Sequence, residues 1–297
     1  MSVVGFKTTL IKKINMKILI IGGTGAFGAF YAKLFYGAGF EIGISSRSEE
    51  KGKAFCKENN YVFSNSPKGY DIVIISVPNE SAPKNVELIS QEIDDETLIV
   101  DFCSVKSHIV PKLETLKEKN IEIASIHPMH GPRVKNLKDI PIVFIPIKTG
   151  KNYNVLKEFF KGKSERVFES NMLEHDTILS VVQGLTHYTQ FVASNVLAEM
   201  NLDLEKTMKF ASPNYSLFLS LASRVMIQNP EMYSQIQIEN PYNEKMREIF
   251  LQKAKELGEI CKSGEKELEK NITKTKKIFK DPEKLLSKSD KMTEVIE

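Results

Sequence analysis

The sequence predicts an α/β protein in which an N-terminal doubly wound domain is followed by an all-α domain. From Lys17 onward, short β-branched runs alternate with helical stretches, and the first run ends in a glycine-rich turn. After Asn171 the strand pattern stops and only helical patterns follow. These observations divide the chain into an extension over 1–15, which we expect to be disordered, an α/β domain over 16–170, and a helical domain over 171–297 with a charged C-terminal tail.

The predicted strands of the first domain are nearly continuous in apolar residues, as strands buried on both faces of a parallel sheet must be. In order they read KILIIGG, FEIGISSR, YDIVIISVP, TLIVDFC and IEIASIHP, and the segments IPIVFIPI and SERVFES extend the sheet. Between the first two strands, AFGAFYAKLFYGAG predicts a helix that ends at Gly37 or Gly39. In a doubly wound fold of this kind, ligands bind at the carboxyl ends of the strands.

The helical domain opens with one long predicted helix over 171–200, whose apolar residues cover most of its circumference. Such a helix must be buried on nearly all sides, and a helical domain this short offers limited core to cover it. We therefore predict a homodimer in which a second copy covers the helix; the alternative is a monomer whose Lys/Glu-rich tail covers it. Further helices are expected to break at ASPNYS, QNPEM and ENPYN, and the tail is interpreted as a solvated helical face.

Composition excludes several classes of function. The chain has 297 residues and a formal net charge of +3, from 41 basic and 38 acidic side chains that are interspersed, which argues against a nucleic-acid groove. No run approaches the ~20 apolar residues that a membrane span needs, so we expect a soluble protein. Cys56, Cys103 and Cys261 are widely separated and form no CxxC pair. We therefore expect neither a disulfide framework nor a metal site, and a cytoplasmic location.

A glycine fingerprint follows the first predicted strand. The stretch GGTGAFGAF contains GxGxxG at Gly23, Gly25 and Gly28, between a strand and the start of a helix. This is the context that a Rossmann-type dinucleotide site requires, since the glycines allow a tight turn, close approach of a pyrophosphate and close helix–strand packing. The cofactor-binding residues predicted from this turn and from the end of YDIVIISVP are Gly23, Thr24, Gly25, Ala26, Phe27, Gly28, Val77 and Pro78.

The choice of dinucleotide depends on the end of the second predicted strand, which reads ISSRSEE. Ser45 and Ser46 offer hydroxyl groups, and the Arg47 guanidinium can pair with the 2′-phosphate of NADP. A carboxylate at this place would instead hydrogen-bond the ribose hydroxyls of NAD. We therefore predict NADP, with NAD as the alternative if Arg47 is solvated and Glu49 or Glu50 meets the ribose.

Polar side chains that could carry chemistry follow two further strands. Ser104 and Lys106 come after TLIVDFC, and His127 comes after IEIASIHP, in the stretch ASIHPMHGPR. Because the carboxyl ends of neighbouring strands face the ligand crevice, we expect these side chains to lie there. The long helix carries the pair His175 and Asp176, and farther on Gln183 and His187, which share one face at ~100° per residue.

Taken in order, these segments resemble the prephenate dehydrogenase family of tyrosine biosynthesis, including its arogenate-using members. The resemblance covers residues 16 to about 240 and rests on GGTGAFGAF, DFCSVKS, SIHPMHGP, EHDTILSVVQGLTH and SRVMIQNPEMY. A glycine fingerprint alone would fit many families, whereas this ordered set is specific. The resemblance implies oxidative decarboxylation of prephenate or arogenate with hydride transfer to NADP. It also implies a dimer formed by interlocked C-terminal helices.

The resemblance also implies roles for individual side chains. His127 aligns with the family's histidine that receives the proton of the substrate's ring hydroxyl, and a neutral imidazole suits that task at cytoplasmic pH. Ser104 would hydrogen-bond the same hydroxyl or the nicotinamide, and Lys106 would support that corner of the site. Arg224 aligns with the family's carboxylate-binding arginine, with His187 and Gln183 lining the substrate pocket.

Some residues depart from the family pattern or admit another interpretation. Gly184 stands where many members have a second histidine, His130 is interpreted as a loop residue, and His108 as solvent-facing. Arg224 could instead be a surface cation. Two other functions remain open: a different NADP-dependent enzyme of the same two-domain plan, such as a 3-hydroxyacid dehydrogenase or imine reductase, and a non-enzymatic nucleotide sensor. The former place a catalytic Lys or Asp on the long helix, where none is well placed here.

Overall fold

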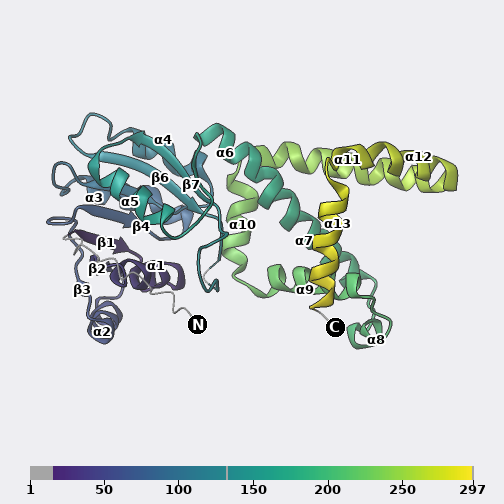
Figure 1. The fold of residues 1–297 in the computed structure, drawn as a ribbon, viewed down its shortest axis with the longest axis horizontal. Coiled ribbons are helices and arrows are strands. Elements are labelled where there is room, and N and C mark those ends of the chain that lie inside the picture. The colour runs from purple at the N-terminus through teal and green to yellow at the C-terminus, as the bar shows by residue number, and fades with distance from the viewer. Residues whose placement is uncertain (1–15, 132, 296–297) are drawn as a thin grey trace, which may run out of the picture. The chain divides into compact units, whose positions relative to one another are not determined.

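The computed structural model describes residues 16–131 and 133–295, so the disorder predicted for 1–15 concerns residues outside the described part. The chain divides into two compact units, the first ending at Asp176 and the second beginning at Thr177. Figure 1 shows the elements of both units. The first unit holds the sheet and the second is helical, which confirms the predicted fold class.

The first unit is built on an eight-stranded sheet with the order β3-β2-β1-β4-β5-β6-β7-β8. The chain leaves β1 in one direction to β2 and β3 and then returns to place β4 on the other side of β1, so the switch point lies between β1 and β4. The strands are β1 Lys17–Ile21, β2 Glu41–Ser45, β3 Val62–Phe63, β4 Ile72–Ile75, β5 Leu98–Asp101, β6 Glu122–Pro128, β7 Ile142–Lys148 and β8 Val167–Glu169.

One strand runs against the others. All neighbours pair in parallel except β6 and β7, which are antiparallel. The sequence pattern predicted that the segment of β7 extends the sheet, which is confirmed, but it did not give the direction of this strand. Parallel neighbours need a crossover connection that is usually helical, whereas the described residues between β6 and β7 form no helix, so β7 returns directly beside β6. The two-residue strand β3 was not predicted either, because it is too short to show alternation.

Helices cover both faces of the sheet (Figure 1). Helices α1 and α5 pack on one face through Phe35 and Phe160, and α3 and α4 pack on the other through Val86 and Leu113. The predicted first helix is confirmed and ends with its C-cap at Gly37. The helices of this unit are α1 Ala26–Tyr36, α2 Glu49–Asn59, the short η1 Asn79–Ser81, α3 Ala82–Ser90, α4 Lys106–Glu114 and α5 Lys151–Lys161.

The predicted long helix over 171–200 is interrupted by a wider turn. It consists of α6, a π-helix labelled η2, and α7. The later breaks fall where they were predicted, and Ser212 and Asn229 cap the helices that follow two of them. The elements are α6 Met172–Leu179, η2 Ser180–Leu185, α7 Thr186–Glu199, α8 Leu204–Met208, α9 Pro213–Ile227, α10 Pro230–Glu239, α11 Tyr242–Lys262, α12 Glu265–Thr275, η3 Lys276–Ile278 and α13 Pro282–Glu294.

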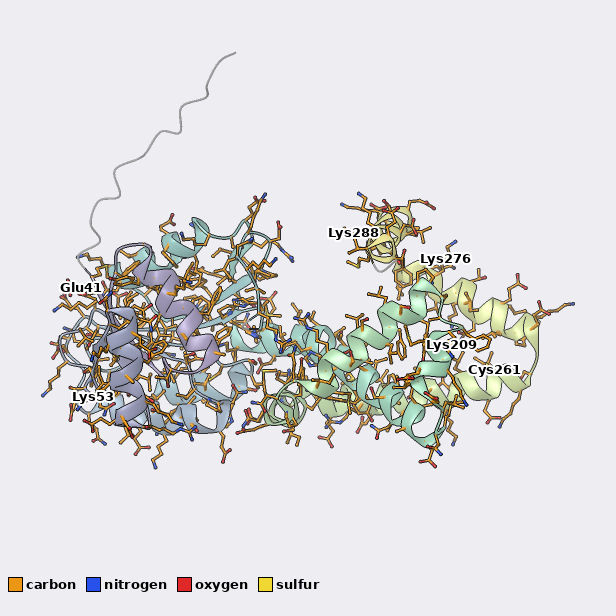
Figure 2. All side chains as sticks on the ribbon, turned by 90° about the horizontal axis from the view of Figure 1, so that it is seen from below. Glu41, Lys53, Lys209, Cys261, Lys276 and Lys288 are labelled. Carbon is orange, nitrogen blue, oxygen red and sulfur yellow. The ribbon has the colours of Figure 1, made fainter. Side chains whose placement is uncertain are left out.

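The helical unit leaves much apolar surface uncovered in a single chain. Helix α7 has no buried residue. Large apolar side chains that are about half exposed along this stretch are Ile178, Val181, Val182, Val196 and Met200. The C-terminal helices are rich in charged side chains, among which Figure 2 labels Lys276 and Lys288. Within the part of the chain that the structure describes, no helix is long and apolar enough to span a bilayer.

Candidate active site

His127 lies at the carboxyl end of β6, in the row of strand ends where a doubly wound sheet binds its ligands. Its side chain is 4% exposed. The nearby Lys106 ammonium is fully buried, donates to the Ile126 carbonyl at 2.9 Å and forms an ion pair with Asp101 at 3.0 Å. Because Ile126 directly precedes His127, this buried pair fixes the end of the strand that carries the imidazole.

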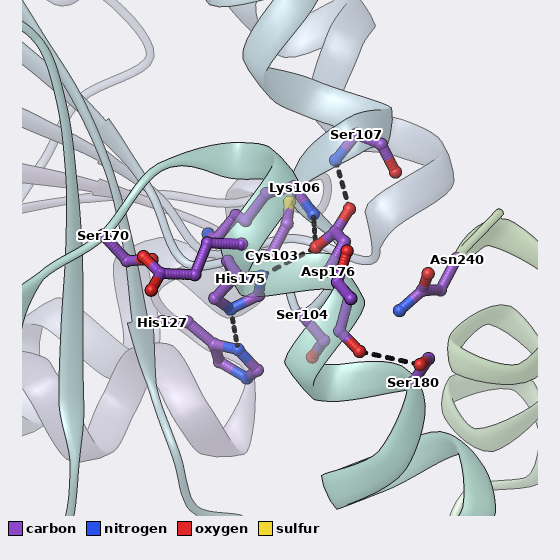
Figure 3. Close-up of polar contacts among 12 residues, drawn as sticks. Cys103, Ser104, Lys106, Ser107, His127, Ser170, His175, Asp176, Ser180 and Asn240 are labelled. Carbon is purple, nitrogen blue, oxygen red and sulfur yellow. Dashed lines mark hydrogen bonds and ion pairs between the residues drawn. The ribbon is translucent and has the colours of Figure 1, made fainter. Parts of the chain in front are cut away.

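His127 is the first member of a chain of three side chains, shown in Figure 3. His127 Nδ1 lies 2.9 Å from His175 Nε2, and His175 Nδ1 lies 2.7 Å from Asp176 Oδ1. The Asp176 carboxylate also accepts hydrogen bonds from the backbone amides of Lys106 at 3.0 Å and Ser107 at 2.6 Å. These amides belong to the first turn of α4, so the start of that helix holds the carboxylate that orients both imidazoles.

These hydrogen bonds determine which ring nitrogens of His127 and His175 carry a hydrogen. A carboxylate can only accept, so His175 Nδ1 must carry a hydrogen toward Asp176. In a neutral His175 the Nε2 atom then accepts, and His127 Nδ1 must be the donor that fills it. The free lone pair of His127 is therefore on Nε2. Such an imidazole is set up to take a proton from a ligand.

The pKa values of the three groups agree with this assignment. Burial, followed by the neighbouring His175 and Lys106, holds the pKa of His127 well below its usual value. Burial also lowers the pKa of His175, although its hydrogen bond to Asp176 acts in the opposite direction. Burial raises the pKa of Asp176, but its hydrogen bonds from His175, Ser107 and the amides of α4 outweigh this and leave it below the usual value. At neutral pH these three side chains are therefore two neutral imidazoles and one carboxylate.

Ser104 lies between β5 and α4, close in sequence to Lys106. Its backbone amide donates to Asn79 Oδ1 at 3.3 Å, and its side chain is only partly buried. In Figure 3 the side chains of Ser104 and His127 point to the same side of the network. The hydroxyl group of Ser104 is able to donate or accept a hydrogen bond on that side.

The glycine turn is built for close backbone approach. Gly22 has φ +80°, a conformation that side-chain-bearing residues rarely adopt, so the tight turn is made at Gly22, one residue before the GxGxxG pattern. Gly23 is needed for space instead, because a Cβ there would lie 2.6 Å from Ile44 Cδ1. A Cβ on Gly28 would lie 2.6 Å from the Gly22 carbonyl oxygen. Gly25 directly precedes α1, which leaves the first amides of that helix open to a pyrophosphate.

The end of β2 lies beside this turn. Thr24 Oγ1 is 3.1 Å from Ser46 Oγ, and Val77 contacts the turn where a Cβ on Gly22 would stand. Ser45 donates to Asn65 at 3.0 Å. These side chains fit the adenosine half of a dinucleotide, and the backbone carbonyl of Ser45 accepts from the turn itself.

Charged side chains follow the end of β2. Arg47 is exposed, and no ion pair engages it among the residues that the structure describes. Glu49, one of the two carboxylates that could serve NAD, lies in the first turn of α2 and is paired with Lys53 at 2.6 Å. The Arg47 guanidinium is therefore available to an anionic ligand group.

The three predicted substrate-binding residues lie in the second unit: Gln183 in η2, His187 in α7 and Arg224 in the last turn of α9. The His187 ring packs edge-on against Tyr233, with 4.8 Å between ring centroids. Tyr233 donates to Gln228 at 3.0 Å, and the charge of Arg224 acts on its hydroxyl. Tyr233 thus packs against His187 and lies within electrostatic range of Arg224.

The imidazole of His187 is uncharged at neutral pH. Burial lowers the pKa of His187 to about 4. Its Nδ1 atom is buried and lacks a hydrogen-bond partner among the described residues. His187 can therefore serve only as a neutral hydrogen-bonding group at that pH.

Both parts of the chain match described domains of one family. Residues 32–169 match "Prephenate dehydrogenase, nucleotide-binding domain", and residues 171–279 match "Prephenate dehydrogenase, dimerization domain". Together the two matches span most of the sequence. The chain belongs to the prephenate dehydrogenase family.

Two curated proteins are similar to this chain in sequence. A probable arogenate/prephenate dehydrogenase from Methanocaldococcus jannaschii is 32% identical over 86% of this chain and 59% of its own length. The T-protein of Haemophilus influenzae is 26% identical over 80% of this chain and 60% of its own length. The chain thus spans about three fifths of the length of these relatives.

Solved structures of the family share this fold. Prephenate dehydrogenase from A. aeolicus, in complex with hydroxyphenyl propionate and NAD+, superposes with a TM-score of 0.72 at 21% identity, over 88% of this chain and 96% of that chain. A reductive aminase from Aspergillus terreus superposes less well, with a TM-score of 0.53 at 14% identity, over 71% of this chain and 77% of that chain. At these identities, both likenesses concern the fold alone.

Several residues that contact the predicted site residues were not assigned a role from the sequence. It noted His175 and Asp176 but gave them no role, because nothing in the sequence shows that they meet a strand end. Asp101 and Tyr233 were not singled out at all. His130 is in a loop, as interpreted, but its ring packs on α1 and its Nε2 lies 2.7 Å from the Tyr31 hydroxyl. The repeated His in HPMHG was the signal that could have suggested a packing role.

No cluster of three or more potential metal ligands occurs among residues 16–131 and 133–295. Cys56 and Cys103 are buried and Cys261 is exposed on α11, where Figure 2 labels it; all three are free thiols.

Proposed function

We propose that this protein is an NADP-dependent dehydrogenase that oxidatively decarboxylates prephenate, or its amino counterpart arogenate, in tyrosine biosynthesis. The observation that carries the proposal is the chain from His127 through His175 to Asp176, which leaves His127 Nε2 as a neutral base at a strand end. Membership of the family supports it. The three free cysteines suit a reducing compartment, so we assign the reaction to the cytoplasm.

The reaction requires a base, a group that binds the substrate carboxylate, and a hydride acceptor. Bound NADP would be the hydride acceptor. As hydride leaves the ring carbon that bears the hydroxyl, His127 Nε2 takes the hydroxyl proton and a carbonyl forms. Ser104 donates a hydrogen bond to the same oxygen. Loss of the ring carboxylate as carbon dioxide then makes the ring aromatic, and the oxygen takes its proton back. The net change is one hydride and one carbon dioxide lost, with no proton released.

The deciding assay follows NADPH formation by the purified protein with prephenate and with arogenate. We expect turnover of at least one of them, and none with simple 3-hydroxyacids. Reaction with a 3-hydroxyacid or an imine alone would favour the other enzyme class. Tight NADP binding without turnover of any substrate would indicate a nucleotide sensor.

Arg224 is proposed to bind a substrate carboxylate. Replacing Arg224 with Ala should raise the KM for the substrate by about 10- to 100-fold and change the KM for NADP little, because a charge-assisted hydrogen bond is worth about 1.5–3 kcal/mol. Arg166, which lies next to β8 and donates to the Asp139 carbonyl at 3.4 Å, provides a matched Arg→Ala control. If Arg224→Ala changes only the thermal stability, Arg224 is a structural cation.

NADP is proposed over NAD because Arg47 is exposed and Glu49 is engaged by Lys53. The wild-type protein should bind NADP more tightly than NAD, and Arg47→Asp should reverse or abolish that preference, since the new carboxylate would repel the 2′-phosphate. Dissociation constants of NADPH and NADH, measured by the fluorescence of the reduced nicotinamide, and of NADP and NAD, measured by calorimetry, test this. A wild-type preference for NAD would refute the assignment.

The homodimer is proposed on the exposed apolar side chains of α6, η2 and α7 and on the match to a dimerization domain. Interfaces that cover such surfaces commonly exceed ~2,000 Å², so the dimer should persist at nanomolar concentration. Light scattering after size exclusion should give twice the chain mass of 33.6 kDa. A mass near one chain with activity intact would contradict the dimer.

A further inference from the structure

Gly184 is the last residue but one of the π-helix η2, and the helix continues into α7, so glycine is a poor choice of residue here. A glycine inside a helix costs ~1 kcal/mol relative to alanine, so its presence needs a structural reason. A Cβ on Gly184 would overlap Asn243 Oδ1. Asn243 belongs to the first turn of α11 and is fully buried. Gly184 therefore allows α11 to approach η2 more closely than any other residue would.

Two buried carboxamides meet at this point, and we name Gln237 and Asn243 the carboxamide clamp. Gln237 Nε2, on α10, donates to the Gly184 carbonyl at 3.0 Å. Asn243 Nδ2 donates to the carbonyls of Ile236 at 2.8 Å and Gln237 at 3.2 Å. Gln237 is 8% exposed and Asn243 is 0% exposed. The clamp thus bonds α10 to Gly184 of the widened turn and bonds α11 to the end of α10, with Asn243 packed against Gly184.

The residues beside this tie are the ones proposed to meet the substrate. Gln183 directly precedes Gly184, and His187 follows it by one turn of helix, with its ring against Tyr233 of α10. A π-helix carries one residue more per turn than the α-helices around it, and it occurs frequently at functional sites. The position of this extra residue in the helix determines the directions in which the side chains of Gln183 and His187 point.

We propose that the carboxamide clamp positions Gln183 and His187 for substrate recognition by holding the widened turn at Gly184. Gln237 and Asn243 are positioning residues in this scheme, since both act through the turn. The inference rests on the proposed function, because it assigns the clamp to the substrate side of that reaction. Its consequence is that substrate affinity, and not cofactor affinity, depends on two side chains that are buried away from the ligand.

The first test removes the clamp. Gln237→Met keeps the side-chain volume but loses the bond to Gly184, and Asn243→Ala loses the contact with it. Each should raise the KM for the substrate about tenfold, the fold-change that one hydrogen bond of ordinary strength is worth, with the KM for NADP unchanged. Asn152→Ala is the matched control, because Asn152 is also a buried carboxamide that donates to two carbonyls, those of Asp71 and Glu96. It should lower the melting temperature without changing the KM.

The second test is a double-mutant cycle. Gly184→Ala alone should raise the KM for the substrate more than tenfold, because its Cβ collides with Asn243. Adding Asn243→Ala should bring the KM back to that of Asn243→Ala alone. A double variant whose KM equals the product of the two single effects would overturn the proposal.

A third measurement does not need activity. The pKa of His187, about 4 in the folded protein because of burial, can be followed by NMR of the five histidines. Clamp variants should raise this pKa toward its ordinary value, because a loosened turn exposes the ring, and Asn152→Ala should leave it unchanged. If neither prephenate nor arogenate is turned over, the proposed function fails while this titration still tests the clamp. An unmoved His187 pKa in both clamp variants would refute it.

Discussion

His127→Asn should lower kcat by ~10²- to 10⁴-fold and leave the affinity for NADP almost unchanged, because that is the range by which general-base help accelerates proton transfer. The asparagine amide can still reach toward His175, in place of His127 Nδ1, but nothing then stands where Nε2 accepted a proton. Steady-state kinetics combined with a direct NADP binding measurement separate the two effects. His108→Asn is the same change at a histidine of α4 that does not belong to the hydrogen-bonded series of His127, His175 and Asp176. The turnover of this variant should stay within about twofold of wild type.

The pH dependence of the wild-type protein provides a second check on His127. Its depressed pKa means that the neutral base persists as the pH falls through the ordinary value of ~6.5. The acid limb of kcat/KM should therefore lie below that value, with activity lost only as the pH falls through the lowered pKa. His127→Asn should abolish this limb. Near-normal turnover in this variant would exclude His127 as the base.

Asp176→Asn should lower kcat by ~10²-fold or more, even though the new side chain has nearly the same shape. The carboxylate accepts from His175 and from the amides of Lys106 and Ser107. An asparagine has one acceptor oxygen for these donors. If its amide nitrogen faces His175, both imidazoles must change tautomer and His127 Nε2 carries a hydrogen. If the nitrogen faces Ser107, two donors confront each other and the start of α4 must shift.

The measurement for Asp176→Asn is again kcat with NADP affinity as the reference. Asp94→Asn is the matched control: Asp94 accepts one backbone hydrogen bond, from Gly69 at 2.7 Å, and lies outside the chain of imidazoles. Its kcat should not change. If the two variants behave alike, the carboxylate does not set the protonation of His127, and the imidazole would have to be oriented by its packing alone.

The sequence by itself determined those features that depend on neighbours along the chain. Apolar runs, glycine positions and capping residues predict strands, the α1 turn and the breaks before α9 and α10, because backbone conformation and hydrogen bonding in these elements are local. The same information placed His127 and Ser104 at strand ends. It also placed Arg47 at the tip of β2, where cofactor choice is decided.

Only the tertiary structure decided which of these groups act together. His127 and His175 are 48 residues apart in the chain, and Lys106 and Asp176 are 70 apart, so no periodicity relates them. The antiparallel direction of β7 depends on the path of its connection, which composition does not reveal. The reason for Gly184 lies in Asn243 of another helix. Each of these is a contact between distant segments, and such contacts follow from how helices and strands pack, whereas sequence patterns record only which face of each element is apolar.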